Sequence, residues 1–332
     1  MGEKIAVIGG GAWGTALAAL AARNGFEVDI YMRETDVATD INTKHENTVF
    51  LPDVELPSKV RAVDMEKLAE TTIPNMIWAV PTQFSRGMAR IYKQALTGKN
   101  ILNASKGIEI ETGKLVIQAL QEEVDATYSL ISGPSFAKEV ALGQPTAVSL
   151  GSEKEDVAKW WQKTLSGDTF RIYTSKDMIG LEVGGALKNV IAVATGIADG
   201  MKYDHNTRAG LITRGLAEIT RFGVKAYGAK RETFMGLAGL GDLVLTATGD
   251  SSRNRQMGKR IAEGFTVDEV SKALKTVSEG VTTAKAVYIV AKEKNIDMPI
   301  CTEVYRIIYE GKNPKDSAVD LMHRPLGSED DI

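Results

Sequence analysis

The sequence begins with Lys4-Ile-Ala-Val-Ile8, followed directly by Gly9-Gly-Gly11-Ala-Trp-Gly14-Thr-Ala-Leu-Ala-Ala-Leu20. This pattern predicts an apolar strand, a glycine-rich turn and an Ala/Leu-rich helix, in that order. Gly9 permits a tight turn, Gly11 lets the backbone approach a pyrophosphate, and Gly14 lets the helix pack against the strand. The alternative is a glycine turn with a structural role alone. Because strand and helix supply the context that the motif requires, the pattern favours a dinucleotide-binding site.

The second predicted strand bears on the choice of dinucleotide. It covers residues 28–32 and ends at Arg33, with Glu34 next in the chain. An acidic residue at this strand end binds the ribose 2′-hydroxyl of NAD, whereas an arginine suits the 2′-phosphate of NADP. We therefore predict NADP(H) as the cofactor, with NAD(H) also accepted. Two alternatives stay open: a turn shifted by one position, which brings Glu34 to the ribose, and an Arg33 that is only a solvated surface charge.

Composition sets further bounds. A chain of 332 residues exceeds the usual size of a single hydrophobic core, so two domains are expected. A net charge of −3 gives no general case for binding nucleic acid or an anionic membrane surface. The single cysteine, Cys301, forms no internal disulfide, which indicates a reducing compartment. The first strand starts too early for a signal peptide, and no apolar run approaches the length of a membrane span, so a cytoplasmic protein is predicted.

The order of apolar segments predicts the fold. Short apolar runs alternate with amphipathic segments in the first half, which is typical of a doubly wound, mostly parallel sheet. From about residue 178, helix-period segments follow one another without convincing strands. We predict a Rossmann-type α/β domain over residues 1–178 and an all-α substrate-binding and catalytic domain over residues 179–332. The other expected strands are 76–80, 100–103, 128–132, 146–150 and 170–173; the expected helices are 85–96, 181–199, 209–222, 267–275 and 282–294.

Two polar groups in the second half interrupt apolar segments. Lys188 lies in an otherwise apolar helix, where an unpaired cation would be costly, although a lysine that reaches solvent is an equal alternative. Asp242 ends a glycine-rich turn before an apolar segment, and a buried carboxylate needs a cation, for which Lys188 is the candidate. Ser251 and Ser252 precede Arg253 and Asn254 at a helix start. This start is read both as an N-cap and as a phosphate-sized anion site.

Six motifs, in order along both halves of the chain, carry a specific resemblance. They are Gly9-Gly-Gly-Ala-Trp-Gly-Thr-Ala-Leu-Ala, Ser105-Lys-Gly-Ile-Glu, Ser132-Gly-Pro-Ser-Phe-Ala, Leu187-Lys-Asn-Val-Ile-Ala, Ala238-Gly-Leu-Gly-Asp-Leu and Ser252-Arg-Asn-Arg. From residue 5 to about residue 314 the sequence resembles the bacterial-type NAD(P)-dependent sn-glycerol-3-phosphate dehydrogenase family. Without this resemblance, the residues alone lead to a nicotinamide-dependent dehydrogenase of a small anionic alcohol.

The resemblance implies reversible hydride transfer between the nicotinamide and C2 of dihydroxyacetone phosphate or sn-glycerol 3-phosphate. It makes Lys188 the general acid and base, with Arg253 and Asn254 as ligands of the substrate phosphate and Thr246 and Asn189 in support. It also implies a supply of glycerophospholipid precursors and a homodimer. The implied substrate-binding residues are Lys106, Gly133, Ser135, Lys188, Asp242, Ser252, Arg253 and Asn254; the cofactor-binding residues are Gly9, Gly11, Ala12, Trp13, Gly14, Arg33, Phe50, Lys106, Ala137, Arg253, Val277 and Glu279.

Several other chemistries are considered. The three histidines, His45, His205 and His323, show no metal-ligand spacing, so no metal is expected. Cys301 has no cationic partner in view, which argues against covalent cysteine catalysis. A β-hydroxyacid dehydrogenase and a sensor that binds NADP without turnover remain as rival functions. Because the candidate residues come from both halves, we also expect the domains to close on their ligands.

Overall fold

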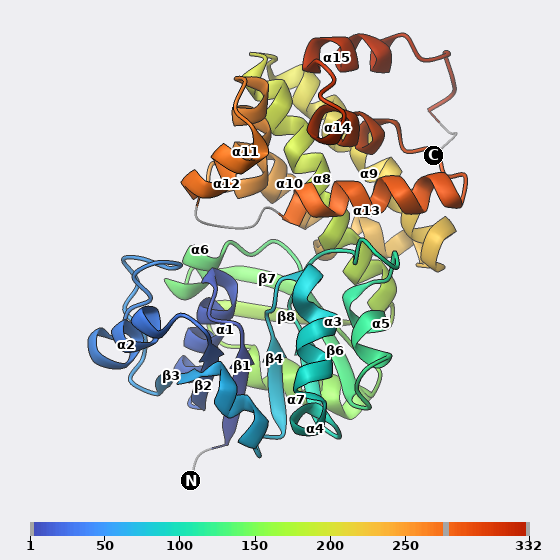
Figure 1. The fold of residues 1–332 in the computed structure, drawn as a ribbon. Helices are drawn as coiled ribbons and strands as arrows, with labels where there is room; N and C mark the ends of the chain where they lie inside the picture. Colours follow the sequence, from blue (N-terminus) through green and yellow to red (C-terminus); the bar gives the residue numbers. More distant parts are fainter. Residues whose placement is uncertain (1–2, 275–278, 330–332) are drawn as a thin grey trace. The chain divides into compact units, whose positions relative to one another are not determined.

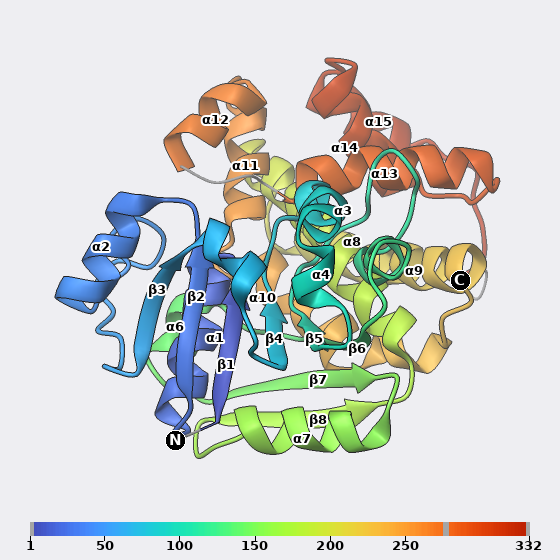
Figure 2. The same cartoon turned by 60° about the horizontal axis from the view of Figure 1, so that its bottom comes forward.

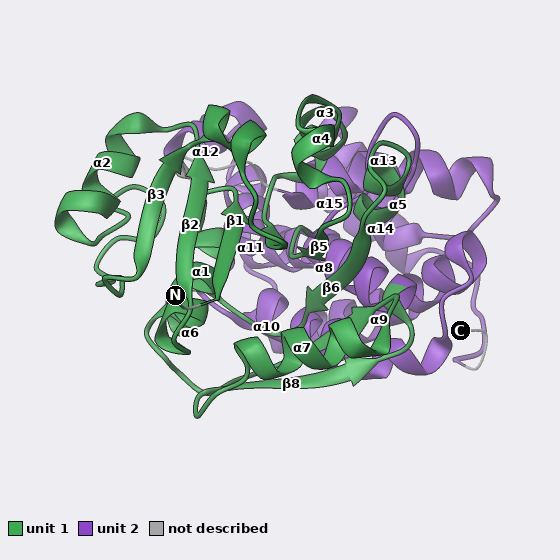
Figure 3. Ribbon diagram, turned by 90° about the horizontal axis from the view of Figure 1, so that it is seen from below, with its two compact units in different colours: residues 1–105, 116–178 green, residues 106–115, 179–332 purple. Residues whose placement is uncertain are grey.

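The computed structural model describes residues 3–274 and 279–329, and Figure 1 shows its elements along the chain. The chain divides into two compact units, which Figure 3 colours separately. One unit comprises Met1–Ser105 and Val116–Met178, and we call it the sheet unit. The other comprises Lys106–Leu115 and Ile179–Ile332, and we call it the helical unit. The predicted single boundary at residue 178 did not anticipate that the segment Lys106–Leu115 belongs to the helical unit.

The sheet unit is built on an eight-stranded sheet in the order β3-β2-β1-β4-β5-β6-β7-β8. All neighbouring strands are parallel except β6 and β7, which are antiparallel. Chain order reverses between β1 and β4, which is the crevice where such sheets bind ligands. The predicted Rossmann-type, mostly parallel sheet is therefore confirmed. The strands are β1 (Lys4–Ile8), β2 (Glu27–Met32), β3 (Val60–Asp64), β4 (Asn75–Trp78), β5 (Asn100–Asn103), β6 (Thr127–Ser132), β7 (Thr146–Ser152) and β8 (Phe170–Ser175).

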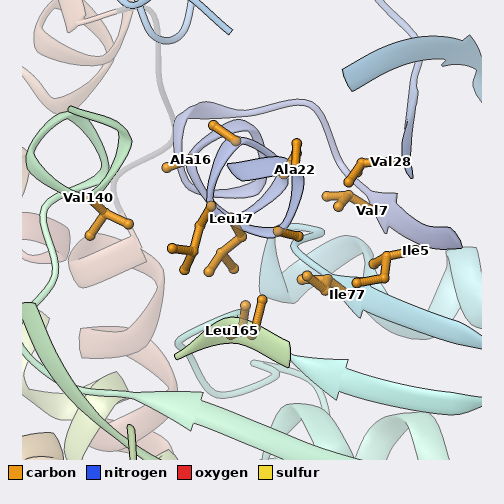
Figure 4. Packing of buried hydrophobic residues seen from close by; sticks show 14 of the residues in the cluster. Ile5, Val7, Ala16, Leu17, Ala22, Val28, Ile77, Val140 and Leu165 are labelled. Carbon is orange, nitrogen blue, oxygen red and sulfur yellow. The ribbon is translucent and has the colours of Figure 1, made fainter. Parts of the chain in front are cut away.

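The helices of this unit pack through apolar side chains against the sheet. In Figure 4, Leu17 of α1 lies among side chains that include Ile77 of β4, Val140 of α6 and Leu165 of α7. Helix α7 runs alongside β7 and β8 (Figure 2). The helices are α1 (Ala12–Arg23), α2 (Thr35–Lys44), α3 (Thr82–Ile91), α4 (Lys93–Leu96), α5 (Val116–Gln121), α6 (Ala137–Ala141) and α7 (Glu155–Leu165).

Within its described residues, the long helices of the helical unit surround α8, a helix that is buried along nearly all its length. By length and composition α8 could cross a membrane, since it has 23 residues and a mean hydropathy of 1.3, so the expectation of no such apolar run is wrong. However, 89% of its apolar window is buried inside the fold, which explains the hydropathy as that of a core helix. The helices are α8 (Met178–Gly200), α9 (His205–Tyr227), α10 (Asp242–Thr248), α11 (Arg253–Ala262), α12 (Val267–Leu274), α13 (Glu279–Glu293), α14 (Pro299–Tyr309) and α15 (Pro314–Met322).

The segment Lys106–Leu115 joins the helical unit through contacts at its tip. Gly113 has a φ of +66° and accepts a hydrogen bond at its carbonyl from the Tyr227 hydroxyl of α9, at 2.6 Å. A Cβ on Gly113 would lie 2.6 Å from a methyl carbon of Val290 in α13, so the segment lies directly against that helix. These contacts anchor the segment that carries Lys106, which is the first residue after the sheet unit.

Candidate active site

Lys188 is inside the helical unit, on the buried helix α8. Its ammonium donates hydrogen bonds to Oδ1 of Asp242 at 2.8 Å and to Oγ1 of Thr246 at 2.7 Å. Only 9% of the Lys188 side chain and 1% of the Asp242 side chain are exposed. The alternative of a solvated surface lysine is therefore wrong, because the side chain is almost fully buried and its ammonium is bound by Asp242 and Thr246. The predicted pairing of Lys188 with Asp242 is present.

Local backbone geometry brings Asp242 to this lysine. A single π turn over Leu237–Gly241 precedes Asp242, which starts α10. A Cβ on Gly184 of α8 would lie 2.6 Å from the carbonyl oxygen of Ala238, so only glycine allows α8 to approach this turn so closely. One turn further along α10, the hydroxyl of Thr246 donates to the Asp242 carbonyl at 2.7 Å. The glycine-rich motif thus serves to place one carboxylate beside α8.

A second lysine shares the same carboxylate. The ammonium of Lys106 donates to Oδ2 of Asp242 at 2.6 Å, and 16% of the Lys106 side chain is exposed. The family resemblance implies that Lys106 binds substrate and cofactor, but sequence reasoning did not predict this contact with Asp242. The signal was not local, since the two residues are 136 positions apart. We call Lys106, Lys188, Asp242 and Thr246 the lysine–carboxylate cluster.

The charges in this cluster shift the protonation equilibria of its members. Burial lowers the pKa of Lys188 to about 8, although the Asp242 carboxylate opposes the shift; the positive charges of Lys106 and Arg253 lower the pKa further. Burial alone would raise the pKa of Asp242, but the two lysines outweigh it and hold that pKa below its ordinary value. Near neutral pH the cluster therefore holds a carboxylate beside a lysine that can give a proton as the ammonium and take one as the neutral amine.

The predicted anion-binding helix start is α11. Ser252 is its N-cap, and the Ser252 hydroxyl accepts a hydrogen bond from the backbone N–H of Arg255 at 3.3 Å. Arg253 is exposed. Partial desolvation of its guanidinium nevertheless lowers the pKa of Arg253, and the Glu279 carboxylate opposes this shift. A guanidinium at a helix N-terminus suits a phosphate, because charge and free N–H groups act together.

Asn254 connects three helices. Its amide nitrogen donates to Oδ1 of Asn189 on α8 at 2.9 Å, and its amide oxygen accepts from the backbone N–H of Gly280 on α13 at 3.0 Å. The residue after the buried lysine is thereby tied to the start of α11. Asn189 and Asn254 were predicted separately, as a supporting residue and a phosphate ligand, and the structure brings them into contact.

The glycine turn of the sheet unit has the geometry that the sequence predicts. Gly9 has a φ of +111°, and a Cβ on Gly14 would lie 2.0 Å from the carbonyl oxygen of Gly9. By contrast, a Cβ on Gly11 would meet nothing within 4 Å, so space is open beside the residue that should approach the pyrophosphate. Gly11 is also the N-cap of α1, whose first turn holds no acidic side chain. This turn can therefore receive an anionic dinucleotide.

Sequence reasoning missed Asn47, which supports this turn. The side-chain amide of Asn47 is buried and donates to the carbonyl of Gly10 at 2.9 Å and to the hydroxyl of Thr15 at 2.8 Å. Its amide oxygen accepts from the backbone N–H of Phe50 at 2.9 Å. Asn47 thus links the glycine turn to the loop of a predicted cofactor residue. An isolated asparagine carries no motif, so nothing in the sequence pointed to it.

The remaining predicted residues lie in both units. Gly133 follows β6 with a φ of +149°, and its carbonyl accepts a hydrogen bond from the Ser135 hydroxyl at 2.9 Å. Arg33 is exposed directly after β2. The indole N–H of Trp13 is buried without a partner among the described residues. Ala12 and Ala137 begin α1 and α6 and are half-buried, as is Phe50, while Glu279 begins α13 and Val277 lies outside the described residues.

Comparison with known proteins gives a consistent result over the whole chain. Residues 4–158 match the family model described as NAD-dependent glycerol-3-phosphate dehydrogenase N-terminus, and residues 177–319 match the model of its C-terminus. The glycerol-3-phosphate dehydrogenase [NAD(P)+] of Oleidesulfovibrio alaskensis is 45% identical over 98% of this chain and 100% of its own. That of Geobacter sulfurreducens is 43% identical over 99% of both. The crystal structure of glycerol-3-phosphate dehydrogenase from Coxiella burnetii has a TM-score of 0.93 at 37% identity, covering 97% of this chain and 99% of that one.

Proposed function

Because the chain belongs to the NAD-dependent glycerol-3-phosphate dehydrogenase family, we propose that it reversibly reduces dihydroxyacetone phosphate to sn-glycerol 3-phosphate, with Lys188 as the general acid and base. The observation that carries the role of Lys188 is its burial beside Asp242, which leaves an ammonium with a pKa of about 8 inside the helical unit. A group whose pKa lies near the working pH transfers protons efficiently in both directions.

The proposed proton transfer uses the Nζ atom of Lys188. In reduction, the ammonium donates its proton to the C2 carbonyl oxygen and stabilises the negative charge that develops there. In oxidation, the neutral amine accepts the proton of the C2 hydroxyl. Asp242 and Thr246 orient Nζ, since both bind it within 2.8 Å. Lys106 adds a positive charge on the other carboxylate oxygen of Asp242, which keeps Asp242 ionised.

We propose that the glycine turn at Gly9–Gly14 and the N-terminus of α1 bind the dinucleotide pyrophosphate. Space beside Gly11 and the buried indole N–H of Trp13, which has no partner in the part of the chain that the structure describes, support this assignment. When bound, the dinucleotide supplies the hydride. Exposed Arg33 favours NADP(H) over NAD(H), since a guanidinium pairs with a 2′-phosphate. Ala12, Gly14, Phe50, Lys106, Ala137, Arg253, Val277 and Glu279 complete the proposed cofactor set.

The substrate phosphate is assigned to Arg253 and Asn254 at the start of α11, next to Ser252. The positive charge of Arg253 is among those that lower the pKa of Lys188, which supports a substrate that contacts both residues in the helical unit. This arrangement would hold a phosphate at one end and a carbonyl oxygen at the other. Gly133 and Ser135 remain proposed substrate contacts on the strength of the family resemblance.

Three further proposals follow from family membership. The product would feed glycerophospholipid synthesis, the chain would form a homodimer, and the protein would work in the cytoplasm. Light scattering of the purified chain tests the dimer, because a mass near the 35.9 kDa of one chain contradicts it.

The proposed reaction is tested by following NADPH and NADH oxidation with dihydroxyacetone phosphate, for the wild type and for Lys188→Met. Methionine keeps the length of the side chain but removes the ammonium, so turnover should fall by about 10²–10⁴-fold while cofactor binding persists. Lys225→Met on α9, at an exposed position, is the matched control and should retain full activity. The ratio of the two wild-type rates reports the cofactor preference that we attribute to Arg33.

No turnover of dihydroxyacetone phosphate by the wild type with either cofactor would contradict the proposed substrate. Turnover that survives in Lys188→Met would contradict the role of the lysine alone. Activity with a hydroxyacid in place of the phosphate ester would favour the β-hydroxyacid dehydrogenase, and cofactor binding without any turnover would favour the sensor.

A further inference from the structure

An ion-pair network joins the first turn of α11 to the far end of α8. The guanidinium of Arg255 donates from Nε to Oδ2 of Asp199, which lies one residue before the end of α8, at 2.5 Å. From Nη1 it donates to the Thr248 carbonyl at 3.2 Å and to Asp250 at 2.9 Å. One side chain therefore holds the last residue of α10, the following loop and the end of α8. We call this network the Arg255 clamp.

The carboxylate of Asp199 is shared with a third helix. Its Oδ1 accepts from Nη2 of Arg208 on α9 at 2.6 Å. Only 8% of the Asp199 side chain is exposed, against 17% for Arg255 and 23% for Arg208. Charged hydrogen bonds with this little exposure to water are weakly screened and hold their geometry more firmly than surface pairs. The clamp is thus a fixed joint among α8, α9 and α11.

Glycines let the backbones of α8 and α11 touch at the same place. A Cβ on Gly196 would lie 1.9 Å from the carbonyl oxygen of Arg255, and a Cβ on Gly258 would lie 2.1 Å from that of Val193. At such spacing the two helices cannot slide past each other without backbone clashes. The register of α11 on α8 is set by this crossing and by the Arg255 clamp.

The proposed phosphate ligands lie, along the chain, between two residues of the Arg255 clamp. Ser252, Arg253 and Asn254 lie between the clamped residues 250 and 255, and Asn254 also binds Asn189, the neighbour of Lys188 on α8. The first turn of α11 is therefore fixed to α8 at two points. One point lies beside the proton-transferring lysine, and the other lies ten residues further along, at Asp199.

We infer that Arg255 and Asp199 are positioning residues for the substrate phosphate, which fix the spacing between the phosphate ligands of α11 and the Lys188 ammonium. Neither residue contacts the substrate in this account; they act through Ser252, Arg253 and Asn254. The inference rests on the proposed function, since it assumes a phosphate bound at α11. A site of fixed spacing selects substrates by the distance from carbonyl to phosphate, because binding energy is gained only when both ends fit.

The test compares dihydroxyacetone phosphate with unphosphorylated dihydroxyacetone in Arg255→Ala and Asp199→Asn. Loss of the clamp should raise KM for the phosphate ester by about 10–100-fold and leave KM for the cofactor unchanged. The kcat/KM for unphosphorylated dihydroxyacetone should stay at the wild-type value, because that substrate makes no use of α11. Arg253→Ala is the positive control and should collapse the preference for the phosphate ester.

Arg260→Ala is the matched negative control. Arg260 lies on the same helix, five residues beyond Arg255, and forms an exposed pair with Glu263 at 3.2 Å. It should leave both substrates unaffected. Arg255→Lys keeps the positive charge but cannot form the several hydrogen bonds of the guanidinium. It should therefore retain only part of the wild-type preference for the phosphate ester. The double variant of Arg255→Ala with Asp199→Asn should be no worse than either single variant, since both remove the same joint.

Equal loss of activity toward both substrates in the clamp variants would overturn the inference, since it indicates a general folding defect. An unchanged preference for the phosphate ester, beside a collapse in Arg253→Ala, would overturn it as well. If the wild type fails to reduce dihydroxyacetone phosphate, the proposed function fails separately. Calorimetry with inorganic phosphate then tests the positioning role of the clamp by itself. Weaker phosphate binding in Asp199→Asn than in the wild type supports that role, and equal binding overturns it.

Discussion

Two buried carboxylates of the helical unit, Asp242 on α10 and Glu218 on α9, have pKa values that are shifted in opposite directions. Asp242 is held by two ammonium groups, and its pKa lies below the ordinary value despite burial. Glu218 accepts backbone N–H groups of Ile300 at 2.7 Å and Cys301 at 3.1 Å, and burial raises its pKa to about 7. Charged partners reverse the effect of burial, whereas dipolar N–H groups only reduce it. Asp242 is thus suited to orient an ammonium group, whereas Glu218 caps the N-terminus of α14.

The largest loss of stability is expected when the ion pairs of Asp242 are removed. Asp242→Asn leaves the ammonium groups of Lys188 and Lys106 without their shared anion, which should lower the free energy of unfolding by about 3–5 kcal/mol. Denaturant unfolding at neutral pH measures the change. Asp297→Asn is the matched control, because Asp297 pairs with Arg324 at 2.7 Å with 59% of its side chain exposed and should cost at most about 1 kcal/mol. Similar losses in both variants would contradict the distinction.

A somewhat smaller effect should come from Glu218, the carboxylate that accepts hydrogen bonds from backbone N–H groups. Because the pKa of Glu218 is raised from 4.5 to about 7 on folding, its contribution to stability is complete below about pH 4.5 and is lost as the pH rises through 7. The loss should be on the order of 3 kcal/mol, since each unit of pKa corresponds to about 1.4 kcal/mol.

Glu218→Gln removes this titration, so its free energy of unfolding should change less than that of the wild type between pH 4.5 and 8. Unfolding curves at several pH values check this. Glu263→Gln, on a partly exposed side chain, should follow the wild type. A free energy of unfolding that falls across this range by as much in Glu218→Gln as in the wild type would show that Glu218 is not the titrating group.

The third prediction concerns the ammonium beside Asp242. With a pKa of about 8 for Lys188, reduction of dihydroxyacetone phosphate should fall about tenfold per pH unit well above pH 8, while oxidation of sn-glycerol 3-phosphate rises through the same pH. Lys106→Met removes a positive charge that lowers the pKa of Lys188, so the fall in reduction should move to higher pH. Rates measured across pH 6–10 in both directions test this. A fall that stays in place or moves to lower pH would contradict the proposed effect of Lys106.

The comparison also shows what the sequence could predict. The pairing of Asp242 with Lys188 was predicted because a carboxylate after a glycine-rich turn, beside an apolar segment, needs a cation that an apolar helix could provide. The contact of Lys106 with Asp242 was not predicted. It depends on the ten-residue segment Lys106–Leu115, which leaves the sheet unit and joins the helical unit. Local sequence carries no sign of that excursion.

Local patterns predicted the architecture well where they were strong. The glycine turn and the long helices follow from periodicity and glycine spacing, and both are present. Strand β3 (Val60–Asp64) was missed, because exposed Arg61 interrupts the apolar residues of this short edge strand and exposed Asp64 ends it. Glu218 was also missed: the buried face of α9 includes Glu218 between Ala217 and Ile219, and a single polar residue in a helical stripe gives no sign of its partner on α14.

The smallest effect should come from a side-chain donor to Glu218. The buried thiol of Cys301 favours the charged form of the Glu218 carboxylate and so lowers its pKa, against the larger effect of burial. Cys301→Ala removes that donor, so the free energy of unfolding should fall by about 1 kcal/mol at pH 8, where the carboxylate is charged. Cys301→Ser keeps a donor of similar size and serves as the matched control. Because loss of the donor raises the pKa of Glu218 further, the decline of stability with pH should extend to higher pH in the alanine variant than in the serine variant. Identical pH dependence in the two variants would mean that backbone N–H groups alone stabilise this carboxylate.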